Sequence, residues 1–366
     1  MQAQHTYRHG RPLHEEEGAV MNHVLVTGGS GYFGSALVRW LKERGLKVAV
    51  FDVEDNHDRP DDVIFFNGDI RDSQTVKIAC QGMDSVYHCA ASALVPNHAA
   101  ELWSINYDGA SNLLQSCQEA RVRKVIYISS SAIFGAAQKN PITDSTRPRP
   151  QDDFGRAKLA AEELCHEYVS KGMDITIIRP RTIMGRCRLG FMQLIFELVR
   201  QGKNIPIPGE GDNLLQFLHA EDLARACLKA ANRKGPSVYN VGAEKFCTLR
   251  QTLEGLIAHA GTESRLMPLP LKPVSAIMKL MNRLGWHPGG LNHALLYGQP
   301  AYFDISRIKK ELHWYPKYGN VAMICESYDW YLKNREQMLR TRPGAYPLSS
   351  EDQGVLNFLA WFLEIA

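Results

Sequence analysis

The sequence predicts an α/β protein with a doubly wound parallel sheet, followed by a smaller and mostly helical C-terminal domain. Short apolar segments at 23–27, 47–51, 63–66, 85–88, 124–128 and 174–178 are typical of buried strands. Segments with helical periodicity separate most of them, at 35–41, 73–81, 102–120 and 155–171. Strands that alternate with helices favour a parallel sheet that is covered on both faces.

The composition excludes several other classes of protein. Of 366 residues, 45% are hydrophobic and 22% are charged, which is typical of a globular protein and excludes a disordered chain. Basic and acidic residues nearly balance, with a net charge of +3, so the composition gives no support to nucleic-acid binding. None of the eight cysteines forms a C-x-x-C pair, so we expect free thiols and no metal site. Without a secretory signal or a membrane span, the expected location is the cytoplasm.

A glycine-rich turn follows the first predicted strand. Gly28, Gly31 and Gly34 give the spacing G-x-x-G-x-x-G directly before a helical segment. Such glycines permit a tight turn, a close approach of the backbone to a pyrophosphate and close packing of helix on strand. The free N–H groups at the start of the helix favour phosphate. The turn, including Tyr32 and Phe33, therefore predicts a dinucleotide site.

An acidic residue ends the second predicted strand. Asp52 lies 18 residues after Gly34. A carboxylate at this position accepts hydrogen bonds from the adenosine ribose hydroxyls and repels a 2′-phosphate. It therefore favours NAD over NADP.

The sequence resembles the extended short-chain dehydrogenase/reductases of the NAD-dependent epimerase/dehydratase superfamily over roughly residues 22–335. The motifs that carry this resemblance are 27–34, Asp52, 68–72, 88–91, N-x-x-G-x-x-N from Asn106, 129–135, Lys158 and Arg179-Pro180. The resemblance implies a Rossmann fold, and it assigns further residues to the cofactor site. These residues are Asp69 and Ile70 at the adenine, Ala90 and Ala91 along the cofactor channel, Asn106 in support of the strand ends, and Pro180.

The same resemblance implies a catalytic set of Ser or Thr, Tyr and Lys, with the last two spaced Y-x-x-x-K on one face of a helix. In this chain Lys158 is expected to bind the nicotinamide ribose. Ser130 is expected to bind the substrate oxygen, and Ser131 takes that role if the loop length differs. The Tyr of the family transfers the substrate proton.

Phe154 occupies the position of that Tyr, and its ring has no proton to transfer. Loss of a positioned general acid or base lowers a rate by about 10²- to 10⁴-fold. Three interpretations remain open at this stage. The chain is an engineered variant, a natural enzyme that uses another acid such as a neighbouring Ser or a water, or a cofactor-binding protein without turnover.

Two positions bear on the substrate. Sugar-nucleotide epimerases and dehydratases that resemble this chain carry an Asn where Thr182 stands and an Arg where Leu215 stands. The Arg-Pro segment is instead similar to the 3β-hydroxysteroid-dehydrogenase-like branch, which implies a lipophilic alcohol or ketone. Ser131, Arg181 and Thr182 are the candidate substrate residues. The sequence thus predicts a nicotinamide-dependent oxidoreductase, with a sugar-nucleotide epimerase or dehydratase and an inactive dinucleotide-binding protein as alternatives.

The chain is expected to divide into four parts. Residues 1–20 form a polar leader, 21–180 the NAD-binding domain, 181–335 a substrate-binding region that partly returns to the first domain, and 336–366 a tail. The tail holds an apolar segment at 355–365, which is too short to span a bilayer and is expected to pack on its own domain, on a second subunit or on a membrane surface. The resemblance also implies a homodimer, formed through the helices at 102–120 and 155–171.

Overall fold

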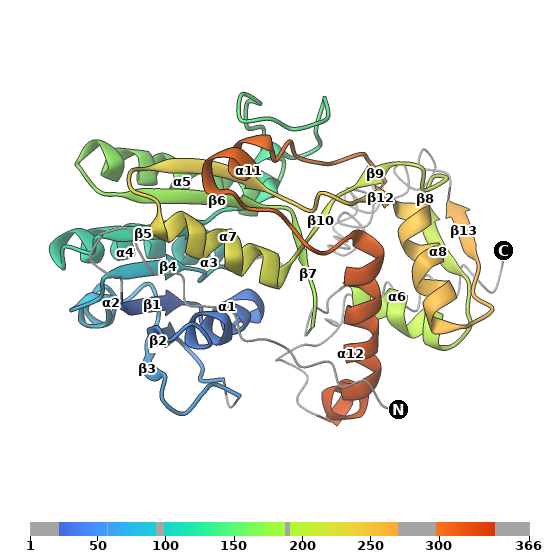
Figure 1. The fold of residues 1–366 in the computed structure, drawn as a ribbon, viewed down its shortest axis with the longest axis horizontal. Coiled ribbons are helices and arrows are strands. Elements are labelled where there is room, and N and C mark those ends of the chain that lie inside the picture. The colour runs from blue at the N-terminus through green and yellow to red at the C-terminus, as the bar shows by residue number, and fades with distance from the viewer. Residues whose placement is uncertain (1–21, 57, 93–98, 187–190, 270–297, 341–366) are drawn as a thin grey trace, which may run out of the picture.

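The computed structural model describes residues 22–56, 58–92, 99–186, 191–269 and 298–340 (Figure 1). The predicted leader and most of the predicted tail lie outside the described residues. Within the described ranges, no helix is both long and apolar enough to cross a membrane.

A seven-stranded sheet forms the centre of the molecule. Its strands run in the order β11-β6-β5-β4-β1-β2-β3, and each neighbouring pair is parallel. This topology confirms the predicted doubly wound parallel sheet. The inner strands are almost continuously apolar because both of their faces are covered. The strands are β1 (His23–Thr27), β2 (Lys47–Asp52), β3 (Ile64–Asn67), β4 (Ser85–His88), β5 (Lys124–Ile128), β6 (Ile175–Pro180) and β11 (Ser237–Val241).

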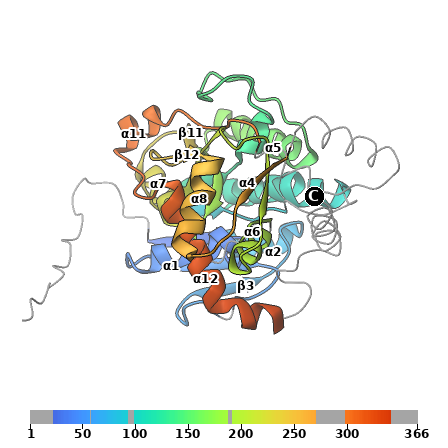
Figure 2. The same cartoon turned by 90° about the vertical axis from the view of Figure 1, so that its right-hand side faces the viewer.

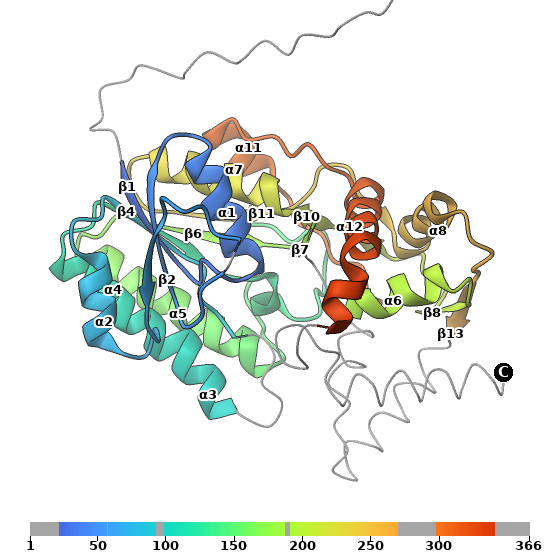
Figure 3. The same ribbon diagram turned by 90° about the horizontal axis from the view of Figure 1, so that it is seen from below.

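Helices cover both faces of this sheet, as Figure 3 shows from below. One face packs against α1 (Tyr32–Lys42), α7 (Ala220–Asn232) and α11 (Ser306–Leu312). The other packs against α2 (Ser73–Cys80), α4 (Gly109–Glu119) and α5 (Asp153–Ser170).

The helix predicted at 102–120 is not one continuous α-helix. The segment runs through α3 (Ala99–Trp103), a π-helical turn η1 (Ser104–Asp108) and α4. Such turns are rare in proteins overall, but those that occur are often found at functional sites. The wider turn places Asn106 in the interior, where its side chain donates to the carbonyl oxygen of Ser92.

The C-terminal lobe has its own apolar core, with Phe196 packed against Tyr328 and Tyr331. It holds more strands than the sequence predicted, because three pairs of short strands join segments far apart in the chain. Figure 2 views the molecule from the side of α6, α8 and α12, and α12 contacts β7 and β10 as well as α6 and α8. The elements are β7 (Thr182–Met184), α6 (Phe191–Arg200), β8 (Ile205–Pro208), β9 (Leu214–Leu215), β10 (Phe217–His219), β12 (Cys247–Thr248), α8 (Leu249–Ala260), β13 (Leu266–Leu269) and α12 (Asn320–Arg340).

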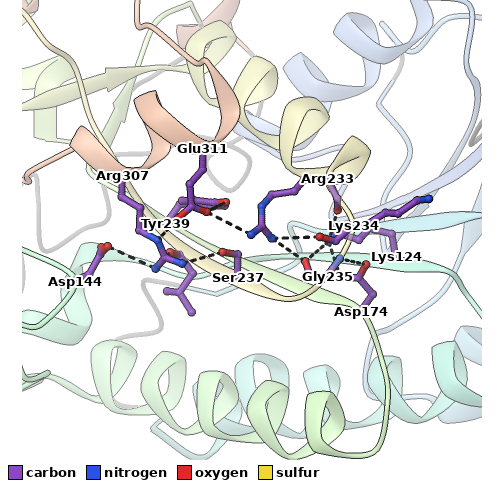
Figure 4. A network of polar contacts seen from close by, with 11 residues as sticks. Lys124, Asp144, Asp174, Arg233, Lys234, Gly235, Ser237, Tyr239, Arg307 and Glu311 are labelled. Carbon is purple, nitrogen blue, oxygen red and sulfur yellow. Dashed lines mark hydrogen bonds and ion pairs between the residues drawn. The ribbon is translucent and has the colours of Figure 1, made fainter. Parts of the chain in front are cut away.

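A polar network joins the amino-terminal ends of β5, β6 and β11 (Figure 4). Lys124 opens β5, and its ammonium donates to Asp174 Oδ1 (2.6 Å) and to the carbonyl oxygens of Arg233 (3.0 Å) and Gly235 (3.1 Å). Its three protons are therefore all used. Burial lowers the pKa of Lys124, while the hydrogen bond to Asp174 opposes that shift.

The same network extends to α11. Glu311 accepts hydrogen bonds from the Tyr239 hydroxyl (2.7 Å) and from Arg307 Nε (2.8 Å), and it pairs with Arg233 (3.4 Å) (Figure 4). Arg307 also pairs with Asp144 (3.5 Å) in the loop before α5. These contacts attach α11 and that loop to the edge of the sheet.

Replacing Lys124 with Met is expected to lower the free energy of unfolding by about 3 kcal/mol, because it removes the charged donor that the Asp174 carboxylate and two carbonyl groups share. The control is Lys77→Met, since the Lys77–Glu119 ion pair has side chains 52% and 40% exposed and is worth at most about 1 kcal/mol. Urea unfolding followed by circular dichroism measures both changes. Equal losses of unfolding free energy in the two variants would contradict the structural role of Lys124 in the polar network.

Candidate active site

The turn between β1 and α1 accepts only glycine at two positions. Gly28 has φ +67°, and a Cβ on it would collide with the backbone of Ala90. A Cβ on Gly34 would overlap the carbonyl oxygen of Gly28. Gly31, at the surface, precedes the helix. The backbone of the turn therefore packs directly against Ala90, after the carboxyl end of β4.

Helix α1 begins directly after this turn. Its N-cap residue is Gly31, and no side chain caps its first N–H groups. Tyr32 is half-buried, while the ring of Phe33 is buried in the core beneath the helix. Phe33 thus offers a cofactor its backbone N–H and not its ring. Uncapped N–H groups at a helix start suit an anionic phosphate, so the residues present fit a dinucleotide pyrophosphate.

Asp52 lies beside the glycine-rich turn. Its Oδ2 accepts from Ser30 N (3.0 Å) and its Oδ1 from Val53 N (2.8 Å), which fixes the carboxylate at the end of β2. Burial raises the pKa of Asp52, and these two backbone hydrogen bonds oppose the shift. The nearby base Arg59 is bound to both carboxylate oxygens of Asp55. Its charge is already neutralised there, which agrees with a site for a ribose hydroxyl and not for a 2′-phosphate.

The segment 69–71, which includes the two residues predicted to contact the adenine, is held by hydrogen bonds from two directions. Arg71 binds Asp69 through Nε (2.9 Å to Oδ1) and Nη2 (2.5 Å to Oδ2), and this hydrogen bonding lowers the pKa of Asp69. Asn112 on α4 donates to the carbonyl oxygens of Ile70 (3.2 Å) and Arg71 (3.0 Å). A Cβ on Gly109 would collide with the buried side chain of Ile70. Gly109 and Asn112, three residues apart on α4, therefore fix the position of this segment.

Asn106, in the π-helical turn, fixes the segment after β4. Its Nδ2 donates to the carbonyl oxygens of Ser92 (2.7 Å) and Leu102 (2.9 Å). Its Oδ1 is buried without a hydrogen-bond partner among the described residues. Ala90 is half-buried and Ala91 exposed, so both small side chains lie next to the clamped segment.

Helix α5 carries the two residues of the predicted catalytic pair. The Asp152 side chain caps it by accepting from Gly155 N (2.7 Å). Phe154 is half-buried in the first turn, and Lys158 follows one turn later with 2% of its surface exposed. The Lys158 ammonium donates to the carbonyl oxygen of Ile128 (2.9 Å) and lies 4.9 Å from the centre of the Tyr127 ring. Burial lowers the pKa of Lys158 to about 8.

The serine loop packs against this helix. Ser130 ends the extended segment after β5, and its Oγ accepts from Ala132 N (3.1 Å) at the start of η2 (Ser131–Phe134). A Cβ on Gly155 would collide with the carbonyl oxygen of Ala132, so η2 and the first turn of α5 are in close contact. The structure thus brings Ser130 and Ser131 to the helix of Phe154 and Lys158. It also gives the Ser130 hydroxyl a capping role.

A buried ion pair, which no motif in the sequence predicted, joins the same helix to the sheet. Arg179 on β6 binds Glu162 on α5 through Nε (2.9 and 3.1 Å) and Nη2 (2.5 Å). Glu162 is only 1% exposed. It follows Lys158 by four residues, and its charge opposes the lowering of the Lys158 pKa. The pair holds α5 against β6 beside Pro180.

Two of the predicted substrate residues, Arg181 and Thr182, directly follow Pro180, which is buried at the end of β6. Arg181 Nε donates to the carbonyl oxygen of Gln216 (3.3 Å), and its guanidinium lies over the Phe303 ring. Thr182 is half-buried and opens β7, where it pairs with Phe217. Leu215 is 2% exposed and belongs to the apolar core of the C-terminal lobe.

Comparison with known proteins gives a consistent assignment. Residues 24–242 match the model of the NAD dependent epimerase/dehydratase family. A protein of Sinorhizobium fredii described as uncharacterized protein y4nG is 41% identical over 322 residues, which are 88% of this chain and 81% of that protein. UDP-glucose 4-epimerase of Halalkalibacterium halodurans is 36% identical over 39% of this chain and 45% of its own length. Human sterol-4-alpha-carboxylate 3-dehydrogenase is 32% identical over 57% of each chain.

Deprotonation of Lys158 is expected to stabilise the cofactor-free fold as the pH rises. Its pKa is about 8 in the folded chain, against an ordinary value of 10.5. Between these values the unfolded chain binds more protons, so the free energy of unfolding contributed by this residue increases with pH. Urea unfolding from about pH 8 to 10 should show a steeper rise for the wild type than for Lys158→Met. Identical slopes would contradict a buried, perturbed lysine.

Proposed function

Because the chain belongs to the NAD dependent epimerase/dehydratase family, we propose that it is an oxidoreductase acting on a secondary alcohol or ketone of a lipophilic substrate. NAD is the cofactor that this membership assigns to the chain. The single observation that carries the proposed substrate class is the burial of Leu215 in an apolar core. A diphosphate has no cationic partner at that position, which weakens the alternative of a sugar nucleotide.

The proposed roles follow from the contacts of each residue. When bound, NAD supplies a hydride acceptor or donor. Asp52 would bind the adenosine ribose, and the first N–H groups of α1 would bind the pyrophosphate. Among the described contacts, the Lys158 ammonium donates one hydrogen bond, to the carbonyl oxygen of Ile128. Its other protons would be available to the nicotinamide ribose. Ser130 would donate its hydroxyl proton to the substrate oxygen, since Oγ only accepts in its capping contact.

Phe154 sets the expected rate. Because its ring carries no proton, the substrate proton must pass through another group, such as a water or a neighbouring serine hydroxyl. We therefore propose a slow enzyme whose binding sites are otherwise complete. The homodimer implied by the family resemblance, through α4 and α5, is part of the same proposal.

Replacing Phe154 with Tyr is expected to raise kcat by about 10²- to 10⁴-fold, since it supplies the missing general acid or base on the face of Lys158. The assay follows NADH absorbance with a panel of hydroxysterols and other lipophilic secondary alcohols. Phe154→Leu is the control, because it changes the side chain without adding a proton.

Three other outcomes decide between the alternatives. Interconversion of UDP-glucose and UDP-galactose by the Tyr variant, without reaction of the lipophilic alcohols, would favour the epimerase. A Tyr variant that binds NAD and reacts with neither panel would favour the inactive binding protein. A rise in the Leu variant equal to that in the Tyr variant would contradict the assigned role of position 154.

A further inference from the structure

A second polar cluster lies at the carboxyl edge of the sheet, outside the catalytic helix. It is centred on Gly185, which follows β7 and has φ +134°. A Cβ on Gly185 would lie 3.1 Å from His219 Nε2 and 3.4 Å from the Tyr32 hydroxyl. Gly185 is therefore the point at which the end of β7, the end of β10 and the glycine-rich turn come together.

Helix α12 binds Gly185 through a buried serine. The Ser327 hydroxyl oxygen accepts from Gly185 N (3.2 Å). Its hydrogen is shared between the carbonyl oxygens of Gly185 (3.0 Å) and Met323 (2.8 Å). Both polar groups of the Gly185 backbone thus contact one side chain from the C-terminal lobe.

The neighbouring residue on α12 binds the other partners. Glu326 Oε2 lies 2.8 Å from His219 Nε2, and Oε1 accepts from Arg186 Nε (2.9 Å). Glu221 N donates to His219 Nδ1 (3.2 Å), so Nε2 carries the ring proton and donates it to Glu326. The hydrogen bond from His219 lowers the pKa of Glu326, which therefore stays ionised. The His219 ring is also stacked on Tyr318 at 3.7 Å.

We infer that Glu326 and Ser327 are positioning residues for cofactor binding. Ser327 holds Gly185, which lies beside the hydroxyl of Tyr32, the first residue of α1, and Glu326 holds His219 next to Gly185. Through this contact the C-terminal lobe sets the position of the glycine-rich turn. The inference rests on NAD binding at that turn, as in the proposed function. It assigns no contact between Glu326 or Ser327 and the cofactor itself.

Calorimetric titration of the full chain with NAD tests this role. Replacing Glu326 with Ala is expected to raise the Kd for NAD by about 3- to 30-fold, the range for residues that act on a site through others. Glu326→Gln keeps an acceptor for His219 Nε2 and should restore most of the affinity. Ser327→Ala should weaken binding in the same direction as Glu326→Ala.

A matched control separates positioning from general stability. Like Glu326, Glu311 is a carboxylate that links side chains from different elements, but it lies in the network near the amino-terminal ends of the strands (Figure 4). Glu311→Ala is expected to lower Tm and to leave the Kd for NAD unchanged. Thermal unfolding of each variant is measured beside the titration.

Two results would overturn the inference while the proposed function stands. One is a wild-type Kd in Glu326→Ala and Ser327→Ala. The other is an equal loss of affinity in Glu326→Ala and Glu311→Ala, which would show that destabilisation alone weakens binding. A wild-type protein that binds no NAD would overturn both this inference and the proposed function.

Discussion

Close backbone packing at the turn between β1 and α1 is the constraint on which the rest of the site depends. Gly28 and Gly34 leave no space for a Cβ, so the start of α1 lies directly over the ends of β1 and β4. This packing exposes the uncapped N–H groups of α1 beside the Asp52 carboxylate. The phosphate site and the ribose site are therefore created together by one local arrangement.

The two edges of the sheet hold buried lysines with different surroundings. Lys124, at the amino edge, has a carboxylate and two carbonyl oxygens for its three protons, and it joins strands to one another. Lys158, at the carboxyl edge, has one carbonyl oxygen and an aromatic face among its described contacts. Burial lowers the pKa of both, but only the second retains donors for a ligand. The number of occupied donors thus distinguishes Lys124, which has a structural role, from Lys158, which we propose binds the nicotinamide ribose.

The sequence was sufficient where the determinants are local. The alternation of strands and helices predicted the sheet, and the glycine spacing predicted the tight turn between β1 and α1. It was insufficient where a contact joins distant segments. The π-helical turn at Asn106 depends on the carbonyl oxygen of Ser92, and the Glu162–Arg179 pair depends on how α5 packs on β6. Helical periodicity does not reveal these contacts between distant segments. It also does not reveal how the short strands of the C-terminal lobe pair.

The most direct test of the central claim is calorimetric titration of the wild type and of Asp52→Asn with NAD and with NADP. We expect the wild type to bind NAD and to bind NADP at least about tenfold more weakly, which corresponds to about 1.4 kcal/mol of repulsion between Asp52 and the 2′-phosphate. The Asn variant should lose most of that difference. Failure of the wild type to bind either dinucleotide would contradict the account.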